Sequence, residues 1–359
     1  GQSSTTRDSE AWLWNPETGI VGLGDLPGGL FGSNAWDVND LSHVSGAAWA
    51  GYPRTVTEAF IWTPALGMVG LGDLRGGDFY SLAYAINNLD QVVGISWSSN
   101  GFEAFMWDAQ NGMVGLGDLP GGQFSSIAHD INDLGHVVGG SFSDEGLEAF
   151  LWTPETGMVG LGPLEPGESS YAYGINNLDQ IVGCSAGQGF LWDPVLETMT
   201  GLPYLDGPAP IAWAYDINDR GEIVGVATPD HLYGYDYATT WDGEQGLRVL
   251  DDLLDASSRQ RTVWLTYAEA INNFGQIAAY DEFVQEAVLL TPVLLGDLNC
   301  DRVVNLFDVE GFVLALLDRP AYRAAYPDCR HEGWAADVNQ DALINNFDIE
   351  PFIELLLGG

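Results

Sequence analysis

The sequence contains no lysine, so arginine supplies all 11 of its basic side chains. The chain also has 51 aspartates and glutamates, which gives its 359 residues a formal net charge of −40 at pH 7. A chain of this charge is repelled by the phosphates of nucleic acids and of anionic membranes, so we expect neither as a partner. Divalent cations are the partners that such a charge favours.

Long apolar runs are absent as well. No run approaches 18 residues, so we expect no segment that spans a membrane. The chain opens with Gly-Gln-Ser-Ser, without Met or a signal-like apolar stretch, which we interpret as a mature product whose secretion signal has been removed. Its 46 glycines and 12% aromatic residues are typical of a turn-rich β protein rather than a disordered acidic tail.

An internal repeat occupies most of residues 1–293, which we predict to be one domain. The phrase Glu-Ala-Phe-x-Trp occurs at 58–62, 103–107 and 148–152, followed each time by Gly-Met-Val-Gly-Leu-Gly and later by an Ile-Asn turn phrase. The anchoring tryptophans recur every 40–49 residues, at positions 14, 62, 107, 152, 192 and 241. Four short strand signals in a period near 45 indicate a β-propeller. We predict six blades, with a seven-bladed or incomplete ring as the alternative.

These phrases resemble the extracellular repeat family named for its His-Ala-Phe signature, written here as Glu-Ala-Phe. The resemblance implies the propeller fold and an extracellular location, and it implies no particular chemistry.

The phrases are not equally frequent. The Ile-Asn turn and the Gly-Leu strand each occur six times, whereas the Ala-Phe-x-Trp strand occurs seven times, because 11–14 and 287–290 both fit it. A closed six-bladed ring therefore leaves one strand with an open edge. That strand can add to the closing blade, run as the linker to the next domain, or complete a neighbouring molecule.

A second pattern occurs twice in residues 294–359, which we predict to be a small all-α domain. Loops 297–308 and 337–348 lie 40 residues apart (337 − 297) and carry Asp or Asn at positions 1, 3, 5, 9 and 12, with position 7 left to its backbone carbonyl. Calcium takes six to eight oxygens, an arrangement that such a loop supplies. Each loop leads into an amphipathic helix. The predicted apolar positions are Val309, Phe312, Val313, Leu316 and Leu317, then Ile349, Phe352, Ile353, Leu356 and Leu357.

Loop and helix together resemble a dockerin-type module, the paired EF-hand-like calcium domain by which secreted bacterial proteins attach to a partner. The resemblance implies two Ca²⁺ sites, and position 12 is Asp rather than the Glu of calmodulin-like sensors. The implied ligands of the first site are Asp297, Asn299, Asp301, Val303, Asn305 and Asp308. Those of the second site are Asp337, Asn339, Asp341, Leu343, Asn345 and Asp348.

In this family, positions 10 and 11 often contact the partner. Here they are Leu306 and Phe307 in the first loop and Asn346 and Phe347 in the second. The expected partner is another copy of this chain, which would give a homopolymer, or a cohesin-like receptor.

The chain has only three cysteines. Cys300 lies at position 4 of the first loop and Cys329 between the loops, so we expect a disulfide that joins them and an oxidising, extracellular setting. Cys184 is left as a buried free thiol or as one half of an intermolecular bridge.

Catalytic motifs are missing from the sequence. We find no His-x-x-x-His, Gly-x-Ser-x-Gly or phosphate loop, and the chain's five histidines do not cluster. Asp37, Asp130 and Asp216, which precede Val-Asn or Ile-Asn, are either turn caps or a ligand site at the mouth of the ring. We therefore predict a secreted, calcium-binding, non-catalytic protein that attaches a propeller to a partner or assembles into an extracellular structural filament. The alternatives are a carbohydrate- or ligand-binding propeller docked onto a receptor and, behind it, a propeller hydrolase or lyase.

Overall fold

The computed structural model describes residues 2–4, 9–29, 32–51, 56–208, 210–230, 234–243, 246–254, 264–292, 294–300, 304–326, 329, 335–338 and 343–357. The chain divides into two compact units, residues 1–290 and 291–359. This division lies three residues before the boundary that the sequence predicts. No helix in these ranges is long and apolar enough to cross a membrane.

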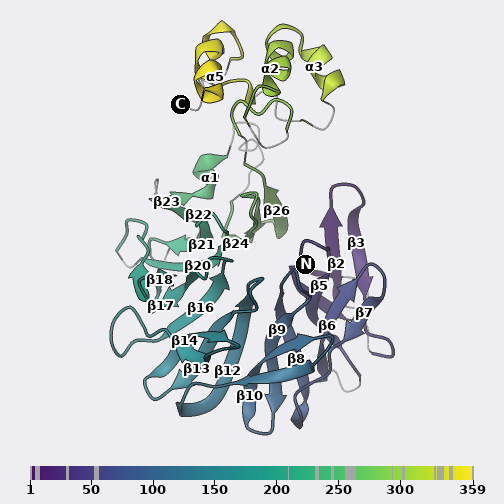
Figure 1. Ribbon diagram of the computed structural model, residues 1–359, viewed down its shortest axis with the longest axis vertical. Helices are drawn as coiled ribbons and strands as arrows, with labels where there is room; N and C mark the ends of the chain where they lie inside the picture. Colours follow the sequence, from purple (N-terminus) through teal and green to yellow (C-terminus); the bar gives the residue numbers. More distant parts are fainter. Residues whose placement is uncertain are drawn as a thin grey trace. The chain divides into compact units, whose positions relative to one another are not determined.

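The larger unit is mainly β and consists of small antiparallel sheets that follow one another along the chain (Figure 1). The five complete units have the same strand order, and we call their strands first to fourth. The first strands are β4 (Ser33–Val38), β8 (Gly76–Ile86), β12 (Gly121–Ile131), β16 (Ser170–Ile175), β20 (Ile211–Ile217) and β24 (Tyr267–Ile271). The second strands are β5 (Val44–Trp49), β9 (Val92–Ser98), β13 (Val137–Ser143), β17 (Ile181–Ser185), β21 (Ile223–Thr228) and β25 (Ile277–Asp281).

The third strands carry the Ala-Phe-x-Trp phrase. They are β2 (Ser9–Asn15), β6 (Thr57–Thr63), β10 (Gly101–Asp108), β14 (Gly146–Thr153), β18 (Gln188–Asp193), β22 (Tyr237–Asp242) and β26 (Glu286–Leu290). The fourth strands are β3 (Gly19–Gly24), β7 (Gly67–Gly70), β11 (Gly112–Gly117), β15 (Gly157–Gly160), β19 (Thr198–Gly201) and β23 (Gly246–Val249).

Two sheets are incomplete within the described residues. The first sheet contains β2 and β3 together with β1 (Gln2–Ser4), which pairs with β2. The last sheet contains β24, β25 and β26. Between them lie five four-stranded units, of which β4–β7 and β8–β11 are joined by one bridge between Thr57 and Tyr80. Over the described part of the chain no sheet closes on itself, so the structure establishes repeated sheets and not a closed ring.

The Val-Val-Gly phrase of the second strands has a steric cause. Each first strand carries a bulge at the same place, as between Ala83 and Ala85 on β8. Gly94 lies opposite this bulge, and a Cβ there would approach the Leu82 carbonyl oxygen to 1.9 Å. On β9 the close approach therefore leaves room only for glycine, whereas Ala279 takes this place in the last sheet. The bulge also turns the extra residue, Tyr84, out of the regular alternation.

Consecutive sheets are joined by a repeated polar bridge. Ser81 on β8 is buried; its Oγ accepts a hydrogen bond from Ala59 N on β6 at 2.9 Å and donates one to Gly72 O at 2.6 Å. Ser33, Ser126 and Ser170 make the same two bonds at their own junctions. The buried Ala and Phe of the third strands, such as Ala59 and Phe105, complete the apolar contact between sheets. The sequence prediction that these strands are buried on both faces is confirmed for β6.

The Gly-Leu-Gly-Asp-Leu phrase forms less strand than the sequence predicts. In β7 the strand ends at Gly70, because the chain then leaves the sheet and buries Leu71 and Leu74 between neighbouring sheets. In the last copy the phrase changes to a short helix, α1 (Leu250–Leu253), directly after β23.

The smaller unit contains α2 (Asp308–Leu317), α3 (Arg319–Ala325), the 3₁₀ turn η2 (Asn346–Asp348) and α5 (Ile349–Leu356). Helices α2 and α5 follow the two predicted calcium loops, as expected. Their apolar faces are only half used, however: Phe312 and Phe352 are buried, whereas Val313 and Ile353 are exposed. A unit of this size has too little interior to cover both rows of each helix.

A disulfide joins Cys300 to Cys329, with a Cα–Cα distance of 5.6 Å, which confirms the predicted pairing. The buried hydroxyl of Tyr322 on α3 donates a hydrogen bond to Leu298 O at 2.9 Å and lies 2.9 Å from Cys329 Sγ. Together these contacts hold the segment between the loops against the first loop. Cys184 is a half-buried free thiol.

Candidate functional site

The first and last positions of both C-terminal loops are buried carboxylates. Asp297 and Asp308 flank the first loop, and Asp337 and Asp348 flank the second. A buried carboxylate costs several kcal/mol unless hydrogen bonds or a cation compensate its charge. Four such groups lie at equivalent positions of the two loops, so both loops need compensation of buried negative charge at the same places.

Asp308 organises the first loop from its last position. Its Oδ1 accepts hydrogen bonds from Leu298 N at 2.8 Å and from Asn299 N at 3.1 Å, and its Oδ2 accepts one from Asn305 N at 2.8 Å. The carboxylate therefore draws the beginning and the end of the loop together. In the second loop, Asp348 Oδ2 accepts the matching bond from Asn345 N at 2.9 Å.

The asparagines at position 9 serve the helices. Asn305 Oδ1 accepts from Phe307 N and Asn345 Oδ1 from Phe347 N, each at 2.8 Å. These bonds satisfy backbone N–H groups at the start of α2 and of η2. An amide oxygen has a second lone pair, so capping does not consume its capacity to ligate a cation.

Four predicted ligands, Asp301, Val303, Asn339 and Asp341, lie outside the described residues. Leu343 is described, and its carbonyl oxygen accepts a hydrogen bond from Asn345 Nδ2 at 3.2 Å. Over the part of the chain that the structure describes, no group of three or more His, Cys, Asp or Glu side chains is arranged to hold a metal. The donor set of the two loops, carboxylate and amide oxygens, is nevertheless the set that Ca²⁺ prefers.

The predicted partner-binding residues all lie at the surface. Leu306, Phe307, Asn346 and Phe347 are exposed at equivalent positions of the two loops. Val313 on α2 and Ile353 on α5 are also exposed, again at equivalent positions. Large apolar side chains exposed at matching places are typical of a protein-binding surface.

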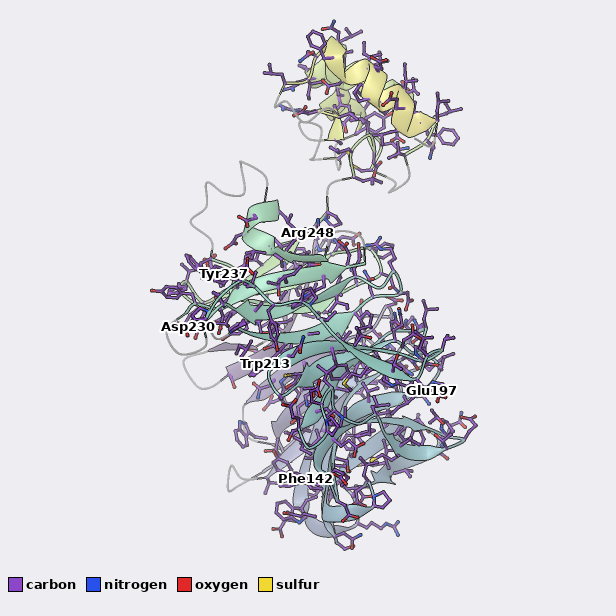
Figure 2. The ribbon with its side chains drawn as sticks, turned by 90° about the vertical axis from the view of Figure 1, so that its left-hand side faces the viewer. Phe142, Glu197, Trp213, Asp230, Tyr237 and Arg248 are labelled. Atoms are coloured by element: carbon purple, nitrogen blue, oxygen red, sulfur yellow. A yellow bond between two sulfur atoms is a disulfide. The ribbon has the colours of Figure 1, made fainter. Side chains whose placement is uncertain are left out.

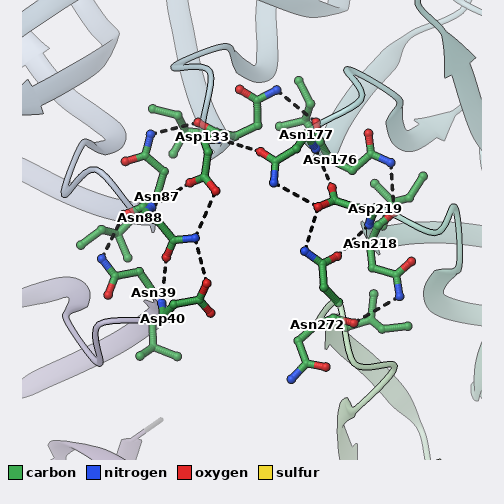
Figure 3. A pocket seen from close by; sticks show the side chains of 18 of the residues that line it. Asn39, Asp40, Asn87, Asn88, Asp133, Asn176, Asn177, Asn218, Asp219 and Asn272 are labelled. Atoms are coloured by element: carbon green, nitrogen blue, oxygen red, sulfur yellow. Dashed lines mark hydrogen bonds between the residues drawn. The ribbon is translucent and has the colours of Figure 1, made fainter. Parts of the chain in front are cut away.

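The larger unit has a polar pocket of about 360 Å³ where the turns between first and second strands converge (Figure 3). One asparagine from each turn donates its Nδ2 to the backbone oxygen of the asparagine in the next turn, as Asn87 does to Asn132 at 2.9 Å. These bonds run in one direction through Asn39, Asn87, Asn132, Asn176, Asn218 and Asn272. Each turn is therefore fixed by its successor.

The next residue of each turn alternates between Asp and Asn. In order they are Asp40, Asn88, Asp133, Asn177, Asp219 and Asn273. Asn88 Nδ2 donates to Asp40 Oδ2 at 3.0 Å and to Asp133 Oδ2 at 3.1 Å, so amides separate the carboxylates around the pocket. This alternation is visible in the sequence as Asp-Val/Ile-Asn-Asp against Ala/Gly-Ile-Asn-Asn, but its meaning depends on the turns meeting at one place.

Asp37, Asp130 and Asp216 begin the three Asp-type phrases. Each accepts a backbone N–H from the following sheet, as Asp130 Oδ2 does from Ile175 N at 2.8 Å. Burial, reinforced by the charges of Asp216 and Asp37, raises the pKa of Asp130 to about 8. Burial also raises the pKa of Asp37 to about 6 and that of Asp216 above its usual value. Hydrogen bonding to the next sheet is the role that the structure gives them.

The bulged residues of the first strands form a belt of rings. Tyr84 stacks on His129 with centroids 5.2 Å apart, and Trp36 and Tyr173 extend the row on either side. Burial lowers the pKa of His129 to about 4, so this imidazole is neutral near pH 7. Sequence patterns did not reveal the belt, because only the bulges bring these positions to one side.

A smaller cavity of about 230 Å³ adjoins this belt. Tyr171, Tyr173, Trp213 and the Cys184 thiol line it (Trp213 is labelled in Figure 2). Burial raises the pKa of Cys184 to about 11, which keeps the thiol protonated at neutral pH.

The histidines in the turns have structural partners. His43 Nδ1 lies 2.7 Å from Asp90 Oδ1, and His136 Nδ1 lies 2.7 Å from Asp179 Oδ1. In the other turns Gln91, Gln180, Glu222 and Gln276 take this place, and each accepts a bond from the asparagine of its own turn. These histidines join one turn to the next.

No family model and no curated protein matches the chain. Among solved structures, the chain is similar to the extracellular domain of a one-component system from B. thetaiotaomicron (10% identity, TM-score 0.40, 80% of this chain and 38% of that one). It is also similar to U3-55K (13% identity, TM-score 0.47, 79% of this chain and 91% of that one). A third similar structure is described as a 6-phosphogluconolactonase from Bacteroides uniformis (11% identity, TM-score 0.42, 80% of this chain and 94% of that one). The chain thus spans well under two thirds of the first of these structures. At such TM-scores, these similarities assign neither a fold nor a function.

Proposed function

We propose that this chain is a secreted, calcium-dependent attachment protein without catalytic activity. In this proposal the C-terminal unit is dockerin-like and binds two Ca²⁺ ions. The repeated sheets form a β-propeller, six-bladed or incomplete, which the C-terminal unit fastens to a protein partner. The Cys300–Cys329 disulfide supports an extracellular location, because such bonds persist in oxidising compartments.

The observation that carries the proposal is the burial of Asp297, Asp308, Asp337 and Asp348 at matching loop positions. Bound Ca²⁺ would supply the positive charge that four buried carboxylates require. Because the unit has a small core, metal binding would also contribute to its folding free energy.

The surface formed by Leu306, Phe307, Asn346 and Phe347 supports a protein as the partner. Aromatic and aliphatic side chains that stand exposed together are the usual anchors of protein interfaces. The partner would be a second copy of the chain or a cohesin-like receptor. In either case the same four residues would contact it.

Calorimetry on the full chain, after treatment with a chelator, tests the calcium sites. We expect two Ca²⁺ per chain, and we expect Asp308→Asn and Asp348→Asn each to reduce this to one. Glu310→Gln is the matched control, since Glu310 is an exposed acid in the first turn of α2. Binding that is absent in the unaltered chain, or unchanged in both Asp variants, would contradict the proposal.

A second candidate function is ligand binding by the larger unit. The polar pocket supports it, because amides and carboxylates from six turns converge on about 360 Å³. Carbohydrates are the ligand class that such hydrogen-bonding groups suit. A glycan array probed with the full chain tests this, with Asn88→Ala as the variant; retention of all signals in the variant would exclude the pocket.

A further inference from the structure

The larger unit contains one third strand too many. Among the described residues there are six first, six second and six fourth strands, but seven third strands. The surplus arises because β2 and β26 both take the third position, one in the first sheet and one in the last. Both sheets are incomplete over the part of the chain that the structure describes: the last sheet lacks a fourth strand, and the first sheet lacks a first strand and a regular second strand. Each sheet contains the strands that the other one lacks.

In the last sheet, β26 fits its position poorly. Leu290 lies opposite Ile277 on β25, just as Trp62 lies opposite Val44 in a complete sheet. By this register, 286–290 correspond to the Glu-Ala-Phe-x-Trp phrase of 58–62. Leu289 is 47% exposed, whereas its counterpart Ile61 is 7% exposed. The aromatic residues of the phrase are missing from β26, and no fourth strand covers it within the described residues.

In the first sheet, β2 and β3 fit their position well. Ala11 N donates to Ser33 Oγ at 3.1 Å, and Ser33 Oγ donates to Gly24 O, as at the junctions bridged by Ser81, Ser126 and Ser170. Glu10 Oε1 also accepts from Gly24 N at 3.3 Å, as Glu58 does from Gly72. The pair β2–β3 therefore packs on β4–β5 as the outer half of a preceding sheet would.

The other edge of β2 is paired only along residues 9–11, by the short strand β1, and its end at Trp14 has no partner strand within the described residues. Trp14 is 44% exposed, whereas Trp241, at the same position of a complete sheet, is 2% exposed. Ile20 on β3 is 69% exposed, against 7% for its counterpart Met68. These apolar residues lack the neighbours that a second strand and the adjoining sheet would provide.

Within the described residues, no strand of the first sheet pairs with a strand of the last sheet. The row of turn asparagines ends at Asn272, whose Nδ2 donates to Gln276 of its own turn. Within the described residues no hydrogen bond joins Asn272 to Asn39, where the row begins. The strands that could complete the last sheet are present in the chain, but they do not pair with it in the part of the chain that the structure describes. A second copy of the chain is therefore the candidate that supplies them.

We propose that the edge of β25 in one molecule receives β2 and β3 of a second copy and completes a four-stranded sheet. In this exchange β2 replaces β26 on β25, and β25 replaces the three-residue strand β1 on β2. This contact goes beyond the proposed attachment by the C-terminal unit, because it lies wholly in the larger unit and its partner is a second copy of the chain. The expected register places Trp14 opposite Ile277 and Leu13 opposite Ala278. Because donor and acceptor surfaces differ, the contact is head to tail and extends into a filament.

Cysteine pairs test this register directly in the full chain. All variants carry Cys184→Ser to remove the free thiol. One chain carries Leu13→Cys and a second carries Ala278→Cys; mixed under mild oxidation, they are expected to form a disulfide-linked dimer on a non-reducing gel. Leu13→Cys mixed with Val195→Cys, an exposed turn residue, is the matched control and is expected to remain monomeric.

The double variant, Leu13→Cys with Ala278→Cys in one chain, shows whether β25 pairs with β2 of the same molecule or with β2 of a second molecule. A ladder of linked chains supports the proposal. A monomer with an internal crosslink, at every concentration and without dimers in the mixture, overturns it. Chelation leaves the crosslinks unchanged, since the contact lies in residues 9–281, so that failure here and failure of the two-site calcium binding are distinguishable.

Discussion

Phe312 and Phe352 stack with their ring centroids 4.1 Å apart and their planes 10° apart. They lie 40 residues apart in the sequence (352 − 312), which is also the offset between the two loops. Each ring is therefore the counterpart of the other in a duplicated loop-helix unit, and each covers the other's face. The two halves of the C-terminal unit share one apolar centre.

This stack yields the first prediction. Phe312→Ala should destabilise the C-terminal unit by about 3–5 kcal/mol, because it removes a buried aromatic ring and leaves a cavity. Scanning calorimetry of the full chain in calcium should show a lower transition for this unit. Phe347→Ala is the control, since Phe347 is exposed, and its effect should stay within about 0.5 kcal/mol. Equal losses in both variants would contradict the role of the stack.

Ser81→Ala tests the bridge between sheets. The change leaves Ala59 N and Gly72 O without their buried partner, at a cost of about 1–3 kcal/mol. Urea unfolding followed by tryptophan fluorescence measures it. Ser99→Ala, at an exposed serine in the turn after β9, should leave the midpoint where it is. A midpoint unaffected by Ser81→Ala would show that water replaces the bridge.

The buried aspartates predict a dependence of stability on pH. The folded chain raises the pKa of Asp130 from 3.8 to about 8, so it binds this proton more tightly than the unfolded chain does. The associated stability is complete below the usual aspartate pKa and is lost as the pH rises toward 8. One group changes the free energy of unfolding by at most about 1.4 kcal/mol per pH unit. Urea midpoints measured across this window should therefore fall.

Asp130→Asn should flatten that pH profile, because the amide does not titrate. Asp108→Asn is the comparison. Hydrogen bonds from Asn111 lower the pKa of the exposed Asp108, so its contribution is lost only as the pH falls below the usual value. A profile that stays equally steep in Asp130→Asn would assign the titration to another group.

Cys184 should be slow to react. With its pKa raised to about 11, the thiolate is scarce at neutral pH, and alkylation should be slower than for a free cysteine by on the order of a hundredfold. Mass spectrometry after timed exposure to iodoacetamide, with and without denaturant, measures this. Linked dimers that Cys184→Ser abolishes would instead support the intermolecular bridge.

The periodic phrases predicted the strands of the larger unit well, because hydrophobic alternation and turn residues are local signals. The third strands 58–62, 103–107 and 148–152 lie inside β6, β10 and β14. The Gly-Asp-Leu ends of the fourth strands were predicted as strand but leave the sheet. There, contact with the next sheet outweighs local propensity.

The candidate sites were harder to predict. The two loops predicted to bind calcium were visible because a metal-binding loop places its ligand types at fixed spacings within one segment. The row of asparagines and the aromatic belt were not, because Asn39 and Asn87, or Trp36 and Tyr84, meet only when distant turns and bulges converge. The exposure of Val313 and Ile353 was likewise missed, since an apolar stripe does not reveal what covers it.

The alternation of Asp and Asn at the pocket constrains how such a chain can change in length. Loss of an inner Asn-type repeat, or gain of one Asp-type repeat within the series, would place two carboxylates side by side, and like charges at that distance repel. Loss of an inner Asp-type repeat would instead place two amides side by side. Loss or gain of a pair of repeats would keep the order. Recombination between the duplicated segments should therefore preserve the alternation when it adds or removes two consecutive repeats, that is, two sheets at a time.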